Sequence, residues 1–162
     1  MPKQLRLNEQ LGLSPASAVR HFVTADELRS VMQDAGSLDV TIKVAEIAQD
    51  SWKLTITRNF EAEWPSIFSN LIGKQLKIRE VRTWSIVNET HATGTMSMEV
   101  VGQPVTMHGT VTLDGRDSGS RVQIDAETRA SIPFIGGIVE DFVVRYLADG
   151  IAHEIQEFNK FA

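Results

Sequence analysis

The sequence predicts an α+β domain in which a seven-stranded antiparallel sheet wraps around one long C-terminal helix. From Asp39 to Ala130, apolar and polar side chains alternate as they do in strands that have one buried face. The turns between these segments are too short for parallel crossovers. An apolar stripe at helical spacing then runs from Ile135 to Phe158.

The composition favours an ordinary globular domain and excludes several kinds of site. The 162 residues fit one domain, and the net charge of -5 without any Lys/Arg run argues against a nucleic-acid partner. The absence of cysteine excludes disulfides, thiol nucleophiles and thiolate metal sites. Since no apolar run has the length of a signal peptide or a membrane span, we expect a cytoplasmic protein without integral membrane association.

The N-terminal segment has no sustained pattern. Residues 1–15 contain four leucines without a clear period, so we expect a partly ordered tail followed by one domain over 16–162. Weak alternation from Ser17 to Val23 predicts the first strand.

Two short helices are predicted. Thr24 and Glu27 have the spacing of a capping box, which predicts a helix near 25–35 that Gly36 ends. Pro65 suits a first helical turn and Gly73 a C-terminal cap, which predicts a second helix near 65–73 over one end of the sheet.

Six further strands follow the first one. Val40–Val44 and Trp52–Ile56 alternate around a hairpin turn at 48–51. The other four strands are predicted at 76–87, 92–101, 104–113 and 120–130.

The C-terminal helix is long enough to cross the whole domain. About 25 residues at 1.5 Å each make a rod of roughly 38 Å, close to the diameter expected for a domain of this size. The helix therefore covers the sheet, and its side chains at Ile138, Phe142, Tyr146 and Ile151 are expected to form one wall of any cavity.

This order of elements resembles the helix-grip fold of the START-like superfamily, also called SRPBCC or Bet v 1-like. More narrowly, NLIGKQLKIREVRTW (Asn70 to Trp84) and SIPFIGGIVEDFV (Ser131 to Val143) look like an uncharacterised domain-of-unknown-function family within it. The resemblance implies a hydrophobic cavity between sheet and helix that holds a lipid, sterol, polyketide or hormone. Some superfamily members are cyclases or dehydratases, but the narrower family supplies no catalytic residues.

The residues expected to line such a cavity are large and apolar. The candidates are Phe68, Ile72, Trp84, Met96, Met98, Met107, Phe134, Ile138, Phe142 and Tyr146. The three methionines make either a deformable ligand pocket or an ordinary core. We expect the Trp64–Gly73 segment and the Phe134–Ile135 turn to act as gates.

Glu80 and Arg82 are possible polar anchors for a ligand. They share strand parity with Ile78 and Trp84, so the four side chains lie on one face of the strand. If that face points inward, the two charges must pair, because an unpaired buried charge is costly. In the more ordinary arrangement Val81 points inward and both charges are solvated.

The sequence thus favours non-covalent binding of a hydrophobic or amphipathic small molecule. A cyclase- or hydratase-type enzyme that uses a cavity acid or base is one alternative, and a partner-binding module with a filled core is another. The four histidines lie on separate elements without metal-ligand spacing, so we expect no metal and no cofactor.

Overall fold

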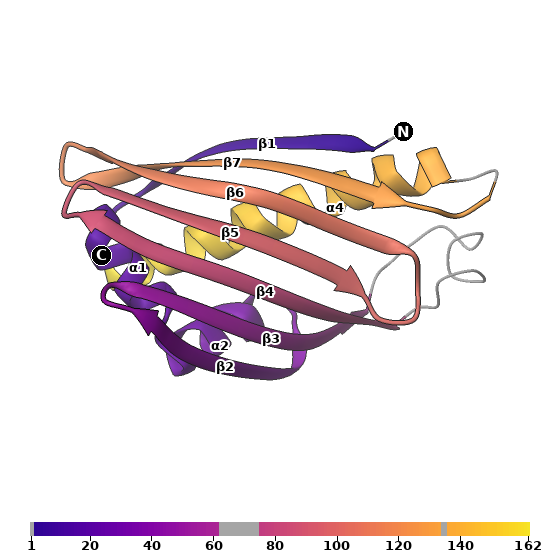
Figure 1. Ribbon diagram of the computed structural model, residues 1–162, viewed down its shortest axis with the longest axis horizontal. Coiled ribbons are helices and arrows are strands. Elements are labelled where there is room, and N and C mark those ends of the chain that lie inside the picture. Colours follow the sequence, from indigo (N-terminus) through magenta and orange to yellow (C-terminus); the bar gives the residue numbers. More distant parts are fainter. Residues whose placement is uncertain (1, 62–74, 134–135) are drawn as a thin grey trace.

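The computed structural model describes residues 2–61, 75–133 and 136–162, and it has the predicted α+β helix-grip architecture (Figure 1). One antiparallel sheet of seven strands has the order β1-β7-β6-β5-β4-β3-β2. The helices lie on one face of this curved sheet, and the long C-terminal helix crosses the strands obliquely. The helix predicted near 65–73, both expected gates, and Phe68, Ile72 and Phe134 fall outside the described residues.

Six strands confirm the alternation seen in the sequence. They are β2 (Leu38–Ala48), β3 (Ser51–Glu61), β4 (Gln75–Asn88), β5 (His91–Val100), β6 (Val105–Arg116) and β7 (Gly119–Ala130). Successive strands from β2 to β7 pair with each other in antiparallel fashion. Along β4, β5 and β7 every second residue is buried, so one face of the sheet carries the core.

The first strand lies earlier in the chain than predicted. Residues Lys3–Leu11 form β1, an edge strand that pairs with β7 from Lys3–Thr128 to Leu11–Ser120. Leu5 and Leu11 are buried and Leu7 packs against the core. The leucines follow a period of two with a polar Glu9 in the series, and the segment predicted as a tail therefore belongs to the sheet.

The strand predicted at 17–23 is wrong, because Pro15–Phe22 forms helix α1. The Ser14 hydroxyl oxygen accepts a hydrogen bond from the Ser17 amide at 3.3 Å, and Pro15 occupies the first turn. Val19 and Phe22 are buried at helical spacing. Ser-Pro is a helix start signal, and it outweighs weak alternation over so few residues.

Helix α2 (Ala25–Asp34) begins and ends where predicted, but without the capping box. The Thr24 hydroxyl donates to the Arg20 carbonyl at 2.7 Å, and the Glu27 carboxylate contacts His21 Nδ1 at 2.5 Å. Both side chains therefore join α2 to α1 and do not cap α2. Gly36 has a φ of 100°, a conformation that ends helices and suits glycine.

Helix α4 (Gly136–Phe158) confirms the long C-terminal helix, and a short 3₁₀ turn, η1 (Asn159–Phe161), follows it. Its buried face is rotated by one residue from the expected stripe at its start, since Val139 and Val143 are buried. Ile138 is 60% exposed and Phe142 is only half-buried, so the predicted wall is displaced there. The Glu140 carboxylate accepts the Ala130 amide at 3.0 Å, which ties the helix start to the end of β7.

Candidate functional site

Four charged side chains meet in the interior between the sheet and α4. They are Arg58 on β3, Glu80 and Arg82 on β4, and Glu154 on α4, which we call the charged cluster. All four are deeply buried, and none is more than 6% exposed. β-Strand alternation directs the first three inward, and Glu154 occupies the face of α4 that also buries Ile151 and Phe158.

Each carboxylate in the charged cluster contacts both guanidinium groups. Glu80 lies 2.5 Å from Arg58 Nη2 and 2.8 Å from Arg82 Nη2. Glu154 lies 2.6 Å from Arg58 Nη1 and 3.3 Å from Arg82 Nη2. Arg58 Nη1 also donates to the Ser37 hydroxyl at 3.3 Å. Two positive and two negative charges thus cancel within the cluster, which reduces the cost of burying them.

Glu80, Arg58 and Arg82 are stabilised in their charged forms by the opposite charges around them. Burial alone would raise the pKa of Glu80, but Arg58 and Arg82 hold that pKa below its ordinary value of 4.5. Burial alone would lower the pKa of Arg82, but Glu80 and Glu154 hold that pKa above its ordinary value. Desolvation and carboxylate attraction oppose each other in the same way at Arg58, whose pKa is also raised. Groups with these pKa directions hold charge well and exchange protons poorly near neutral pH.

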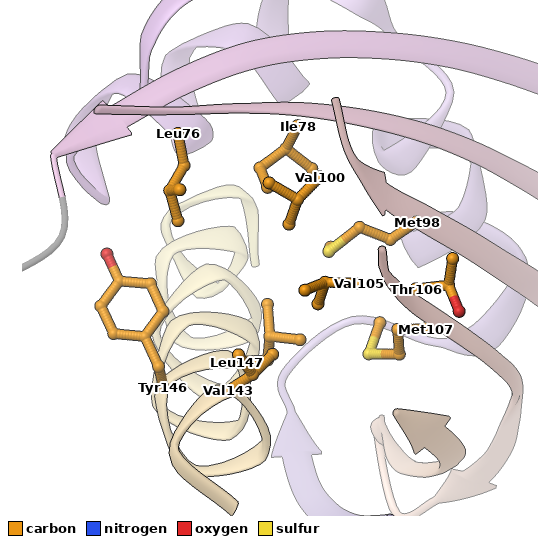
Figure 2. Close-up of a pocket in the computed structure, with 10 residues that line it drawn as sticks. All are labelled: Leu76, Ile78, Met98, Val100, Val105, Thr106, Met107, Val143, Tyr146 and Leu147. Carbon is orange, nitrogen blue, oxygen red and sulfur yellow. The ribbon is translucent and has the colours of Figure 1, made fainter. Parts of the chain in front are cut away.

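An apolar pocket lies beside the cluster, toward the start of α4 (Figure 2). It encloses about 20 Å³. Its lining residues are Leu76, Ile78, Met98, Val100, Val105, Thr106, Met107, Val143, Tyr146 and Leu147. Met98 and Met107 face α4 from the strands, while the Tyr146 hydroxyl points away from them. The enclosed space holds about one water molecule. The large apolar cavity expected between sheet and helix is therefore mostly filled here, and a bound ligand requires the flexible methionines to move.

A larger cleft of about 370 Å³ also borders Tyr146 and Leu147, and because polar and apolar groups line it together, unlike the apolar pocket, we call it the polar cleft. Residues from the end of α2, from β3 and from α4 line it: Ala35, Gly36, Ser37, Arg58, Glu61, Tyr146, Leu147, Asp149, Gly150, Ile151, His153 and Glu154. The cleft therefore reaches the charged cluster at Arg58 and Glu154. A Cβ atom built on Gly150 meets no atom within 4 Å, so this glycine leaves part of the cleft wall open.

Tyr146 and Leu147 border both the apolar pocket and the polar cleft. Desolvation raises the pKa of Tyr146 above its ordinary value of 10.0, and nearby Arg58 opposes this rise. The phenol is therefore neutral near neutral pH. Tyr146 and Leu147 thus lie where the apolar pocket and the polar cleft meet. This arrangement suits a molecule with one apolar end and one polar end.

The structure brings together several predicted residues and separates others. Met98, Met107 and Tyr146 line the apolar pocket, whereas Trp84 and Met96 line a second cavity further along α4. Glu80 and Arg82 point inward, so the ordinary arrangement with solvated charges is wrong. Ile138 and Phe142 line none of these hollows.

Sequence reasoning missed Arg58 and Glu154. Arg58 follows Leu54 and Ile56 with the same strand parity, and Glu154 lies four residues before Phe158 on the apolar stripe. The signal that could have identified them is the presence of charged residues at inward-facing positions of three elements, with equal numbers of positive and negative charges.

The described residues contain no group of three or more His, Asp or Glu side chains arranged to hold a metal ion. Within the same ranges, no helix has both the length and the apolar character needed to cross a membrane.

Comparison with solved structures shows that other proteins share this helix-grip fold. The crystal structure of TTHA0849 from Thermus thermophilus superposes with a TM-score of 0.66 at 14% identity, covering 98% of this chain and 95% of that one. The di-domain ARO/CYC protein StfQ from the steffimycin biosynthetic pathway gives 0.64 at 9% identity, covering all of this chain and 51% of StfQ. At these identities the likeness shows the fold alone.

The chain belongs to the family described as "Protein of unknown function (DUF2505)", whose model matches residues 8–161. Among its relatives is the uncharacterized protein Rv0481c of Mycobacterium tuberculosis, which is 24% identical over 162 residues, 95% of this chain and 93% of that protein. The match begins within β1, in keeping with the place of that strand in the sheet.

Proposed function

We propose that this protein binds an amphipathic small molecule at the boundary between the apolar pocket and the polar cleft. The observation that carries the proposal is the shared wall of Tyr146 and Leu147, which has a hydrocarbon and thioether surface on one side and a polar surface on the other. The START-like fold supports the proposal because it is a ligand-binding fold.

We expect the two ends of the ligand to divide between the two hollows. The polar head group lies in the cleft, and the apolar chain enters beside Leu147 as Met98 and Met107 rotate. Burial of that end is worth about 25 cal/mol per Å² of apolar surface. The ionised charged cluster provides fixed dipoles at the inner edge of the cleft.

The pKa directions favour binding over acid–base catalysis. Glu80, ionised and held by two arginines, has no proton to donate and is a weak base, and the raised pKa of Tyr146 keeps the phenol protonated and makes it a weaker acid. These groups are suited to orienting a ligand by charge and hydrogen bonding.

Gly150 offers a test that leaves the core intact. A Gly150→Leu side chain projects into the open cleft, while the helix gains up to about 1 kcal/mol from the loss of glycine. We expect Gly150→Leu to melt at or above the wild-type temperature and to lose the thermal shift produced by binding amphiphiles. The probes are dodecanol, dodecanoate and dodecylamine, which share one chain and differ in the head group.

Gly150→Ala is the matched control, because it gives the same helix gain with a much smaller side chain. It should keep most of the ligand-induced shift. The proposal is contradicted if no probe raises the melting temperature of the wild type, or if Gly150→Leu responds to the probes as the wild type does.

A further inference from the structure

A second cavity lies beyond the charged cluster, toward the C-terminal end of α4. It encloses about 40 Å³ between α1, α2, strands β4 to β7 and α4. Phe22, Leu28, Met96 and Val111 give it apolar walls, and Arg82 and Glu154 give it a charged one. This space is about twice that of the apolar pocket and holds about two or three water-sized groups, enough for a small molecule or the end of a larger one.

Trp84 lines this cavity and carries an unused hydrogen-bond donor. The residue is only 6% exposed, and its Nε1 has no hydrogen-bond partner in the described protein. A buried donor without a partner costs about 1–3 kcal/mol, and native proteins retain few of them. Such a donor beside an enclosed space indicates a ligand or water acceptor.

Gly94 on β5 keeps the indole in this position. It pairs directly with Trp84, and a Cβ atom at residue 94 would lie 2.5 Å from Trp84 Cε3. The ring therefore lies against the bare backbone of β5, and any larger residue would displace it. The unsatisfied donor is thus part of a closely packed arrangement and does not come from a loose side chain.

The charges on the cavity wall select the kind of acceptor. Arg82 and Glu154 already bind each other at 3.3 Å and lie in a cluster without net charge. A charged ligand would gain little net attraction from this neutral pair and would lose its hydration between the other, apolar walls. A neutral oxygen is the acceptor that fits.

We propose that this cavity is a binding site for a small neutral molecule or end group whose carbonyl or hydroxyl oxygen accepts a hydrogen bond from Trp84 Nε1. The site is separate from the Tyr146–Leu147 wall, so it does not depend on the amphiphile site proposed above. A failure of either proposal leaves the other intact.

The test follows the indole N–H signals by ¹H–¹⁵N NMR while acetone or isobutene is added. Isobutene has the shape of acetone with CH₂ in place of oxygen. We expect acetone to move the Trp84 signal downfield in a saturable way, with an affinity roughly fivefold or more above that of isobutene. Trp52, half-buried and paired with Trp84 across β3 and β4, is the internal control and should not move.

Two sets of variants complete the test. Trp84→Phe identifies the signal and should remove the preference for acetone. If that chain does not fold, Trp52→Phe and Trp64→Phe identify Trp84 by elimination. Val111→Leu adds a methylene to the cavity wall and should weaken acetone binding while the indole stays in place.

The proposal is overturned if the Trp84 signal does not respond to acetone, or responds equally to isobutene. It is also overturned if the indole proton contacts a long-lived water that acetone does not displace, since the cavity would then be a hydration site only.

Discussion

The charged cluster and the apolar pocket fill neighbouring parts of one interior in opposite ways. Arg58, Glu80, Arg82 and Glu154 satisfy each other through short contacts of defined geometry. The side chains of the apolar pocket make van der Waals contacts, whose strength depends on the buried area and the fit. Two of these side chains are flexible methionines. The ion pairs therefore fix one arrangement of side chains in the charged cluster, whereas the side chains of the neighbouring apolar pocket can rearrange.

The largest effect should come from breaking the charged cluster. Glu80→Gln removes a carboxylate that serves two buried arginines, and we expect the free energy of unfolding to fall by about 3–5 kcal/mol. Urea unfolding measures this. Glu127→Gln, which affects an exposed pair with Arg129 at 3.4 Å, should cost less than about 1 kcal/mol.

Replacing the whole cluster should be less damaging than breaking it. The variant with Arg58→Met, Glu80→Leu, Arg82→Met and Glu154→Leu leaves no charge in the cluster, so its stability should exceed that of Glu80→Gln. If the fourfold variant is less stable than Glu80→Gln, the ion pairs of the charged cluster stabilise the fold by more than their burial costs.

A smaller loss is expected at the apolar end. Met107→Ala should lower the free energy of unfolding by about 2–4 kcal/mol, since Met107 is 1% exposed and packs beside the pocket. Ile138→Ala, at 60% exposure on α4, should change it by about 0.5 kcal/mol or less. A large loss at Ile138 would show that the N-terminal end of α4 packs differently.

The two regions should also differ in their response to acid. Because the folded pKa of Glu80 lies below 4.5, its contribution is complete above that pH and is lost as the pH falls from 4.5 through the folded value. In urea unfolding between pH 7 and pH 2, the wild type should therefore lose more stability than the fourfold variant. Equal losses would mean that Glu80 is not stabilised by the arginines.

The smallest effect concerns Tyr146, the one tyrosine of the chain. Its raised pKa predicts that absorbance at 295 nm titrates above pH 10.0 in the folded protein and near 10.0 in urea. The unfolded state ionises first, so stability falls as the pH rises above 10.0. Identical midpoints in both states would place the phenol in water.

The strands could be predicted because one face of the sheet is exposed to solvent, so polar and apolar residues alternate along each strand. The edge strand β1 and helix α1 could not be predicted. β1 has few apolar residues, and α1 is too short to show a helical period. The partners of Glu80 and Arg82 come from residues 58 and 154, and only the tertiary fold brings these segments together. The small size of the apolar pocket likewise depends on side-chain packing, which no sequence pattern reports.

Native mass spectrometry tests the central claim most directly, by comparing freshly purified wild type with Val143→Phe and Val144→Phe. Val143 lines the apolar pocket, while its neighbour Val144 lines none of the three hollows that border α4. We predict that the wild type and Val144→Phe carry a small molecule that is released on denaturation, and that Val143→Phe lacks it. A wild type that carries no such molecule and takes up none of the dodecyl probes would contradict the account.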